Sequence, residues 1–326
     1  MTTGRAGGPA REVLAVKYGH RVTTRAESYL NFHLYGEPDA ELDIDYFFWV
    51  IRDGADVILV DTGFAPEVGD RKGRAHYTTP AEVLPALGIG TGDVTAIVVS
   101  HAHWDHTGNV RQFPRAQVVM SEAEYAFWTS PLARRAHFAA HSEPDEIALL
   151  AQARKEDRLT LFTGGYTLAP GIELTEVGGH TPGQLLASVA TPDGGGSAST
   201  VVLASDALHF YEEVERDRPF AILADLPAMY RAYDTLAQLA QQPNTWLVAG
   251  HDPLVRARFA RHAVPGVPDG VEVTDLSGPP TRPLPACRRA GTGKPASPRC
   301  RAVPRTRATA GTRRSPGGSS APRPRR

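Results

Sequence analysis

Three histidines and one aspartate fall within six residues of the segment HAHWDH. They are His101, His103, Asp105 and His106. Imidazole nitrogens and carboxylate oxygens are the usual ligands of divalent metals such as zinc. In an extended backbone alternate side chains share a side, so His106 would point away from the other three. One metal could hardly bind all four side chains. A loop curled around two adjacent metals could bind them, and further ligands must then come from downstream.

The residues before this cluster decide between a metal site and its simpler alternative, an exposed polar turn that happens to be rich in histidine. Val94 to Val99 form a nearly unbroken apolar run. Such a run is typical of a strand buried on both faces of a sheet. The four polar side chains therefore follow the end of a buried strand, a setting that favours the metal site.

Other strands and helices must carry the remaining ligands. Apolar and β-branched runs predict strands at 13–24, 29–35, 44–51, 57–60, 117–120, 159–162, 172–177, 185–191, 200–204 and 245–249. Capping residues and apolar periodicity predict helices at 79–87, after 121, within 130–158 and at 225–242.

Three residues at the ends of predicted downstream strands are candidates for the missing ligands. His180 lies in GGHTPG, Asp206 in ASDA and His251 in AGHD. Taken singly, each is also compatible with a turn residue or a hydrogen-bonded core group. His137 and His141, at helical i, i+4 spacing, could also share a metal, but a solvated helix face is the preferred interpretation.

The HAHWDH segment resembles the signature of the metallo-β-lactamase superfamily, and the chain to about Arg261 is similar to that family in its order of elements. The best match within it is the branch of N-acyl homoserine lactone lactonases and related small-lactone hydrolases. The resemblance implies an α/β fold, a four-layer αββα sandwich, over residues 11–265. It also implies that Asp61, in an Asp-x-Gly turn, supports the metal loop; an ordinary turn former is the alternative.

The resemblance assigns the ligands to two metals. The first takes His101, His103 and His180, the second takes Asp105, His106 and His251, and Asp206 bridges them. The all nitrogen and oxygen set suits two divalent ions, with Zn²⁺ as the first expectation and Mn, Fe or Co also acceptable. A hydroxide bridging the two metals would attack the ester carbonyl of a small lactone, and Asp105 would pass the proton to the leaving alkoxide.

One position departs from the resembling lactonases. These have a tyrosine three residues after the bridging aspartate, and here that position is His209. Either His209 or the nearby Tyr211 could donate a hydrogen bond to the substrate carbonyl, and both could equally be packing residues. The same scaffold also serves glyoxalase-type thioesterases, phosphodiesterases, nucleases and iron oxygenases. A non-enzymatic regulatory protein is the less favoured alternative.

The formal net charge of −1 hides an uneven distribution. Residues 277–326 hold 13 of the 35 Lys and Arg and no acid, which leaves 22 basic and 36 acidic residues before them, a formal charge of −14. Nucleic-acid binding needs clustered positive charge, so none is expected of this acidic body. The Pro/Arg-rich residues 266–326 are expected to form a disordered basic tail, with a shifted reading frame as the alternative origin.

The cysteines and the two ends of the chain limit the possible chemistry and cellular location of the protein. Both cysteines, Cys287 and Cys300, lie in the tail, so the body has no thiol ligand or nucleophile. The glycine-rich residues 1–10 are expected to be flexible. Because no signal-peptide core or membrane-length apolar run is found, we expect a cytoplasmic protein with no membrane partner. The sequence leaves the oligomeric state open.

Overall fold

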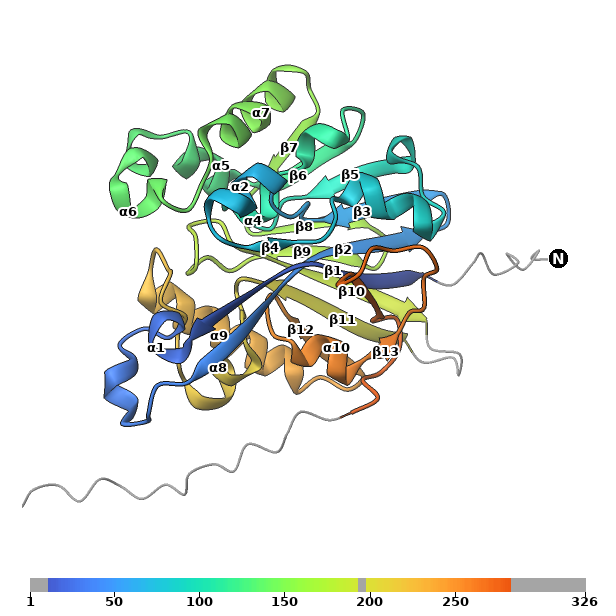
Figure 1. Cartoon of the computed structure of the whole chain (residues 1–326). Helices are drawn as coiled ribbons and strands as arrows, with labels where there is room; N and C mark the ends of the chain where they lie inside the picture. Colours follow the sequence, from blue (N-terminus) through green and yellow to red (C-terminus); the bar gives the residue numbers. More distant parts are fainter. Residues whose placement is uncertain (1–10, 193–197, 283–326) are drawn as a thin grey trace, which may run out of the picture. The chain divides into compact units, whose positions relative to one another are not determined.

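Two β-sheets form the centre of the molecule (Figure 1). The structure, a computed structural model, describes residues 11–192 and 198–282. The strands of the larger sheet are β1 (Glu12–Thr24), β2 (Glu41–Asp53), β3 (Asp56–Val60), β4 (Ala75–His76), β5 (Val94–Val98), β6 (Gln117–Ser121), β7 (Leu159–Phe162), β13 (Ala260–Arg261) and β14 (Glu272–Asp275). Their order is β13-β14-β1-β2-β3-β5-β6-β7, and β4 pairs with β1.

The smaller sheet follows later in the chain. Its strands are β8 (Gly165–Ala169), β9 (Ile172–Glu176), β10 (Leu185–Pro192), β11 (Ala198–Ser205) and β12 (Thr245–Ala249). Their order is β12-β11-β10-β9-β8, with β11 and β12 parallel. In the larger sheet β3, β5, β6 and β7 are parallel. The carboxyl ends of parallel neighbours share one edge of a sheet, so residues after these strands are brought together.

Helices cover the outer face of each sheet (Figure 1). The larger sheet carries α2 (Pro66–Arg71), α5 (Glu122–Trp128) and α7 (Pro144–Lys155), and the smaller sheet carries α8 (Tyr211–Arg216) and α9 (Leu226–Ala240). The short helix α10 (Leu254–Arg258) follows β12 and lies next to β13 and β14, at the edge of the larger sheet. The remaining helices, each a single turn, are α1 (Arg25–Ser28), α3 (Pro80–Val83), α4 (Trp104–Thr107) and α6 (Ala136–Ala139). The predicted four-layer αββα arrangement is confirmed.

Strand alternation explains how one chain builds two hydrophobic cores. Along β1, Leu14 and Val16 pack in the core under the helices, whereas Val13 and Ala15 pack in the core that the two sheets share. Successive side chains of a strand point to opposite faces, so a strand covered on both sides must be apolar throughout. The apolar run predicted as a buried strand behaves in this way, because Ile97 and Val98 of β5 belong to different cores.

Two expectations need correction. Residues 29–35 are not a strand: an isolated bridge pairs Tyr29 with Phe220, and a 3-10 helix spans Phe32–Tyr35 after Asn31 adopts a φ of +52°. A short alternation of aromatic and polar residues is compatible with a strand or with a 3-10 helix. Here the packing of the aromatic side chains favours the 3-10 helix. The tail does not begin at residue 266, because β14 pairs antiparallel with β1, burying Val273.

The rest of the expected tail, with both cysteines, and the expected flexible residues 1–10 lie outside the described residues. Among the residues that are described, no helix has the length and apolarity needed to cross a bilayer.

Candidate metal centre

The seven predicted ligands come together at the strand ends. His101 and His103 follow β5, and Asp105 and His106 lie on the one-turn helix α4. The other three come from the smaller sheet: His180 precedes β10, Asp206 follows β11 and His251 follows β12. All but Asp105 are at most 6% exposed.

A glycine is required at one point of this assembly. Gly179, directly before His180, has a φ of +96°, and a Cβ atom there would lie 2.6 Å from the Cα of Met229. Any other residue would be strained and would clash with the backbone of α9. The glycine pair noted in the sequence thus lets the His180 loop approach the helix closely.

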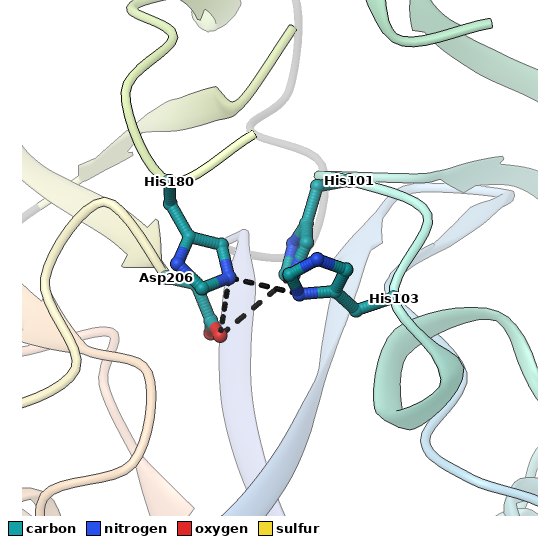
Figure 2. A group of neighbouring side chains, drawn as sticks. All are labelled: His101, His103, His180 and Asp206. Atoms are coloured by element: carbon teal, nitrogen blue, oxygen red, sulfur yellow. Dashed lines mark hydrogen bonds and ion pairs between the residues drawn. The ribbon is translucent and has the colours of Figure 1, made fainter. Parts of the chain in front are cut away.

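The first group of ligands surrounds one oxygen of Asp206 (Figure 2). Nε2 of His180 lies 3.3 Å from Oδ2 of Asp206 and 2.9 Å from Nδ1 of His103. Nε2 of His101 lies 3.7 Å from the same carboxylate oxygen. Four potential ligand atoms from His101, His103, His180 and Asp206 lie within 4.8 Å of one another.

The second group faces the other oxygen of the same carboxylate. Oδ1 of Asp206 lies 3.1 Å from Nε2 of His251 and 3.3 Å from Nε2 of His106. Asp105 completes this group: its Oδ2 atom lies 3.8 Å from Nε2 of His106 and 3.9 Å from Nε2 of His251. Asp206 therefore stands between the two groups with one oxygen toward each.

Hydrogen bonds to the far nitrogen fix the orientation of these imidazoles. Nδ1 of His180 and Nδ1 of His251 each lie 2.8 Å from a backbone carbonyl oxygen, of Ile222 and Asp45 respectively. Nδ1 of His106 lies 2.8 Å from Oδ2 of Asp61. A donor bond at Nδ1 fixes the tautomer and leaves Nε2 as a lone-pair donor, the form in which histidine binds metal.

The charge balance of the site suits the binding of cations. Burial lowers the pKa of His101, His103 and His180 well below the ordinary value, so these rings are neutral. Burial acts in the same direction on His106, but nearby carboxylates, chiefly those of Asp206 and Asp61, raise its pKa well above the ordinary value. The second group therefore needs a positive charge among its carboxylates, which a proton or a metal ion supplies.

Unsatisfied polar atoms support the metal interpretation. In the described part of the chain, three buried atoms of the predicted ligands have no hydrogen-bond partner: Nε2 of His101, Nε2 of His106 and Oδ1 of Asp206. Buried polar atoms without partners are costly, so their convergence needs an explanation. The donor set of five imidazoles and two carboxylates fits two divalent ions of the zinc type.

Comparison with known proteins agrees with this geometry. Residues 46–251, more than half of the chain, match the family model of the Metallo-beta-lactamase superfamily. The chain belongs to this superfamily. Within the superfamily, it is 28% identical over 234 residues to N-acyl homoserine lactonase AiiB of Agrobacterium fabrum, which covers 67% of this chain and 82% of that protein. It is 25% identical over 230 residues to an N-acyl homoserine lactonase of a Bacillus species, covering 66% and 84%.

Solved structures show the same superfamily fold. A quorum-quenching N-acyl homoserine lactone lactonase superposes with a TM-score of 0.61 at 20% identity, covering 75% of this chain and 93% of that one. AidC, a dizinc quorum-quenching lactonase, has a TM-score of 0.58 at 21% identity, covering 76% and 88%. The predicted resemblance to the metallo-β-lactamase superfamily and its lactonase branch is thus confirmed.

A pocket of about 240 Å³ opens over the metallo-β-lactamase centre. His103, Asp105, His180, Asp206 and His251 are among its lining residues. His141 lines the pocket too and is half-buried, which corrects the expectation of a solvated face for that residue, whereas His137 is exposed.

The two candidate donors near Asp206 behave differently. His209 lines the pocket, and its Nε2 atom lies 3.1 Å from Oδ2 of Asp206. Tyr211 does not line the pocket: its buried hydroxyl donates to the carbonyl oxygen of Leu247 at 3.1 Å. The expectation that Tyr211 contacts substrate is therefore corrected, because the side chain of this first residue of α8 turns into the core between sheet and helix.

Sequence reasoning missed Glu124, which is fully buried beneath both histidine loops. Its carboxylate accepts hydrogen bonds from the backbone N–H of Ala102 at 2.8 Å and of Gly183 at 2.9 Å, and from the indole of Trp128 at 2.6 Å. Glu124 thus ties the loop of His101 and His103 to the loop of His180. The only local signal was an acidic residue in the first turn of a helix, which ordinarily indicates capping.

Proposed function

We propose that the protein is a dinuclear metal-dependent hydrolase that opens the ring of a lactone, with N-acyl homoserine lactones or related small lactones as the substrate class. The observation that carries the proposal is the placing of Asp206 between two ligand groups, with one carboxylate oxygen toward each. The likeness to N-acyl homoserine lactonases supports the choice of a lactone over other esters. Quorum quenching is the corresponding biological activity.

The ligands would divide between two metal ions. His101, His103 and His180 would hold the first, Asp105, His106 and His251 the second, and Asp206 would contact both. When bound, two divalent ions would lower the pKa of a bound water toward about 7 and would withdraw electron density from an ester carbonyl. We propose zinc for both positions, which the nitrogen-rich ligand set and the dizinc neighbour support.

Two side chains would act on the reacting atoms. Asp105 is the most exposed ligand, with 12% of its side chain accessible, and its carboxylate lines the pocket. It would take up a proton as water adds to the carbonyl and release it to the alkoxide that leaves when the ring opens. His209, stacked on Phe220 with ring centroids 3.9 Å apart, would donate a hydrogen bond to the carbonyl oxygen of the substrate.

A hydrolysis panel on the metal-loaded protein tests the proposal. The panel contains an N-acyl homoserine lactone, an unsubstituted lactone, a glutathione thioester and a phosphodiester. We expect the highest kcat/KM on a lactone, and loss of that turnover in Asp105→Asn with metal content largely retained. Preferential cleavage of the thioester would favour the glyoxalase-type alternative. A metal-loaded protein that hydrolyses no lactone would overturn the proposal.

A further inference from the structure

Three cationic side chains line one wall of the pocket: Arg21, Lys72 and Arg74. We propose that this cationic wall binds an oxyanion, a carboxylate or a phosphate, carried by the substrate at a distance from the ester that is cleaved. The inference rests on the proposed hydrolase function and narrows its substrate class from neutral lactones to anionic ones. Among the residues that line the pocket, the only carboxylates are Asp105 and Asp206, both needed as ligands.

Lys72 and Arg74 lie together between α2 and β4, beside the metal loop. Nζ of Lys72 is 5.0 Å from the ring centroid of Trp104, and the guanidinium of Arg74 is 5.8 Å from it. Trp104 separates the ligands His103 and Asp105 in the chain. The two cations therefore stack against the loop that carries four ligands, and a substrate held by them would lie next to the centre.

Neither cation is neutralised by the protein. Over the described ranges 11–192 and 198–282, no carboxylate oxygen lies within 4 Å of Lys72 or of Arg74. Nζ of Lys72 donates to the carbonyl oxygen of Ala140 at 3.1 Å, and Arg74 donates to that of Lys72. Nε of Arg74 is buried without a hydrogen-bond partner. Both side chains are partly buried, and without a carboxylate partner their charges are available to an anionic ligand in the pocket.

Arg21 extends the wall across the sheet edge. It lies on β1, which pairs with β4 through His20 and Ala75, and so it comes next to Arg74. Its partner Glu27 is 3.0 Å away and 62% exposed, an ion pair screened by solvent. The ring of Tyr46, which also lines the pocket, is 5.1 Å from that of His251.

The positive charge of a metal-loaded centre would strengthen the attraction of the pocket for anions. Two divalent ions would outweigh the two ligand carboxylates, and the cationic wall adds three further positive charges. A positively charged pocket of about 240 Å³ concentrates anions and repels cations. Guanidinium groups also offer two parallel N–H donors, a geometry that matches the oxygens of carboxylate or phosphate. A neutral acyl chain would leave these cations desolvated and unpaired.

The test compares substrates that differ only in a terminal charge. Homoserine lactones of one acyl length would end in a methyl, a carboxylate or a phosphate group, and kcat/KM would be measured on the metal-loaded protein. We expect the better of the two anionic substrates to exceed the neutral one at least tenfold, a gap that narrows as salt is raised. The two anionic arms decide between carboxylate and phosphate.

Variants assign the preference to the wall. In Lys72→Met and in Arg74→Gln the ratio of kcat/KM for anionic over neutral substrate should fall at least fivefold. Arg71→Gln removes the same charge one residue away, from a 57% exposed side chain outside the pocket, and should keep the wild-type ratio. Equal effects of the pocket variants on both substrates would show a merely structural role and overturn the inference.

A binding measurement separates failure of the inference from failure of the proposed function. Calorimetry would give the dissociation constants of the ring-opened products with neutral and charged ends. Tighter binding of the charged product, lost in Arg74→Gln, would support the wall even if no lactone is hydrolysed. Equal affinity for both products, or a wild-type preference for the neutral lactone, would reject the wall while leaving the hydrolase proposal intact.

Discussion

Nδ1 of His106 lies 2.8 Å from Oδ2 of Asp61, and both side chains are almost fully buried. Asp61 also accepts hydrogen bonds from the backbone N–H of Ser100 at 2.8 Å and from its hydroxyl at 2.7 Å. The carboxylate is therefore held rigidly under the metal loop. It directs Nε2 of His106 toward the centre and stabilises the ring electrostatically when a cation binds there.

Asp61→Asn should weaken binding of the metal shared by Asp105, His106 and His251. Removing such a carboxylate partner of a histidine ligand typically costs 10- to 100-fold in metal affinity. Competition against a chromophoric chelator measures this affinity. Asp56→Asn, at the exposed first residue of β3, is the matched control and should bind metal like the wild type. Unchanged affinity in Asp61→Asn would mean that Asp61 only shapes the turn.

His209 and Tyr211 lie two residues apart, and we expect their substitution to affect kcat differently. His209 lines the pocket, whereas the hydroxyl of Tyr211 donates to Leu247 inside the core. His209→Phe should lower kcat for a lactone by about 10²-fold, the typical effect of losing one donor to a developing oxyanion. Tyr211→Phe should leave kcat within about twofold and cost about 1 kcal/mol of stability. Equal kcat losses in both variants would contradict this assignment.

Glu124 should matter for stability as well as for metal retention. Glu124→Gln places an amide nitrogen against one of three donors, and a buried mismatch of this kind costs about 1–3 kcal/mol. Calorimetric unfolding of the metal-loaded protein should show a Tm lower by on the order of 5 °C. Glu122→Gln, exposed two residues earlier in the same helix, should change Tm little. If Glu124→Gln unfolded like Glu122→Gln, the link between the two loops would be unimportant.

The stability of the protein should depend on pH through Glu146. Burial raises the pKa of this carboxyl to about 8, and its Oε2 atom lies 2.6 Å from the hydroxyl of Thr107. Between its unfolded pKa and about 8 the folded state binds the extra proton, so the contribution of Glu146 to stability becomes less favourable as pH rises from its unfolded pKa toward 8.

Glu146→Gln mimics the protonated form and should flatten this dependence. Urea unfolding at pH 5.5 and pH 8 should show the variant gaining relative to the wild type at the higher pH. Asp145→Asn, exposed beside it, should follow the wild-type slope. A variant with the wild-type pH slope would show that Glu146 is already ionised at neutral pH.

The ligands of the centre could be predicted because metal chemistry restricts residue types and strand ends restrict positions. His101 to His106 stand after an apolar run, so local sequence marked them as candidate ligands. Local sequence left His180, Asp206 and His251 open, and the family resemblance selected them; the structure brings all seven into two groups that could hold metal ions. The αββα layers followed from family resemblance, and the burial of β5 on both faces followed from its nearly unbroken apolar run.

The supporting residues could not be predicted, because their roles depend on distant partners. Glu124 touches Gly183, which lies 59 residues away, and nothing near Glu124 marks it as buried. The side chains of His209 and Tyr211 point in different directions because α8 begins at Tyr211, and sequence alone does not fix such a boundary within two residues. The strand β14 was missed because Pro and Gly surround it, and its stability comes from pairing with β1, some 260 residues earlier.

Elemental analysis of the protein purified without chelators tests most directly whether the seven side chains hold a two-metal centre. We expect two divalent ions per chain in the wild type and one or fewer in Asp206→Ala, because Asp206 offers one oxygen to each ligand group. Well below one ion per chain in the folded wild type, or two ions retained in Asp206→Ala, would contradict the dinuclear centre.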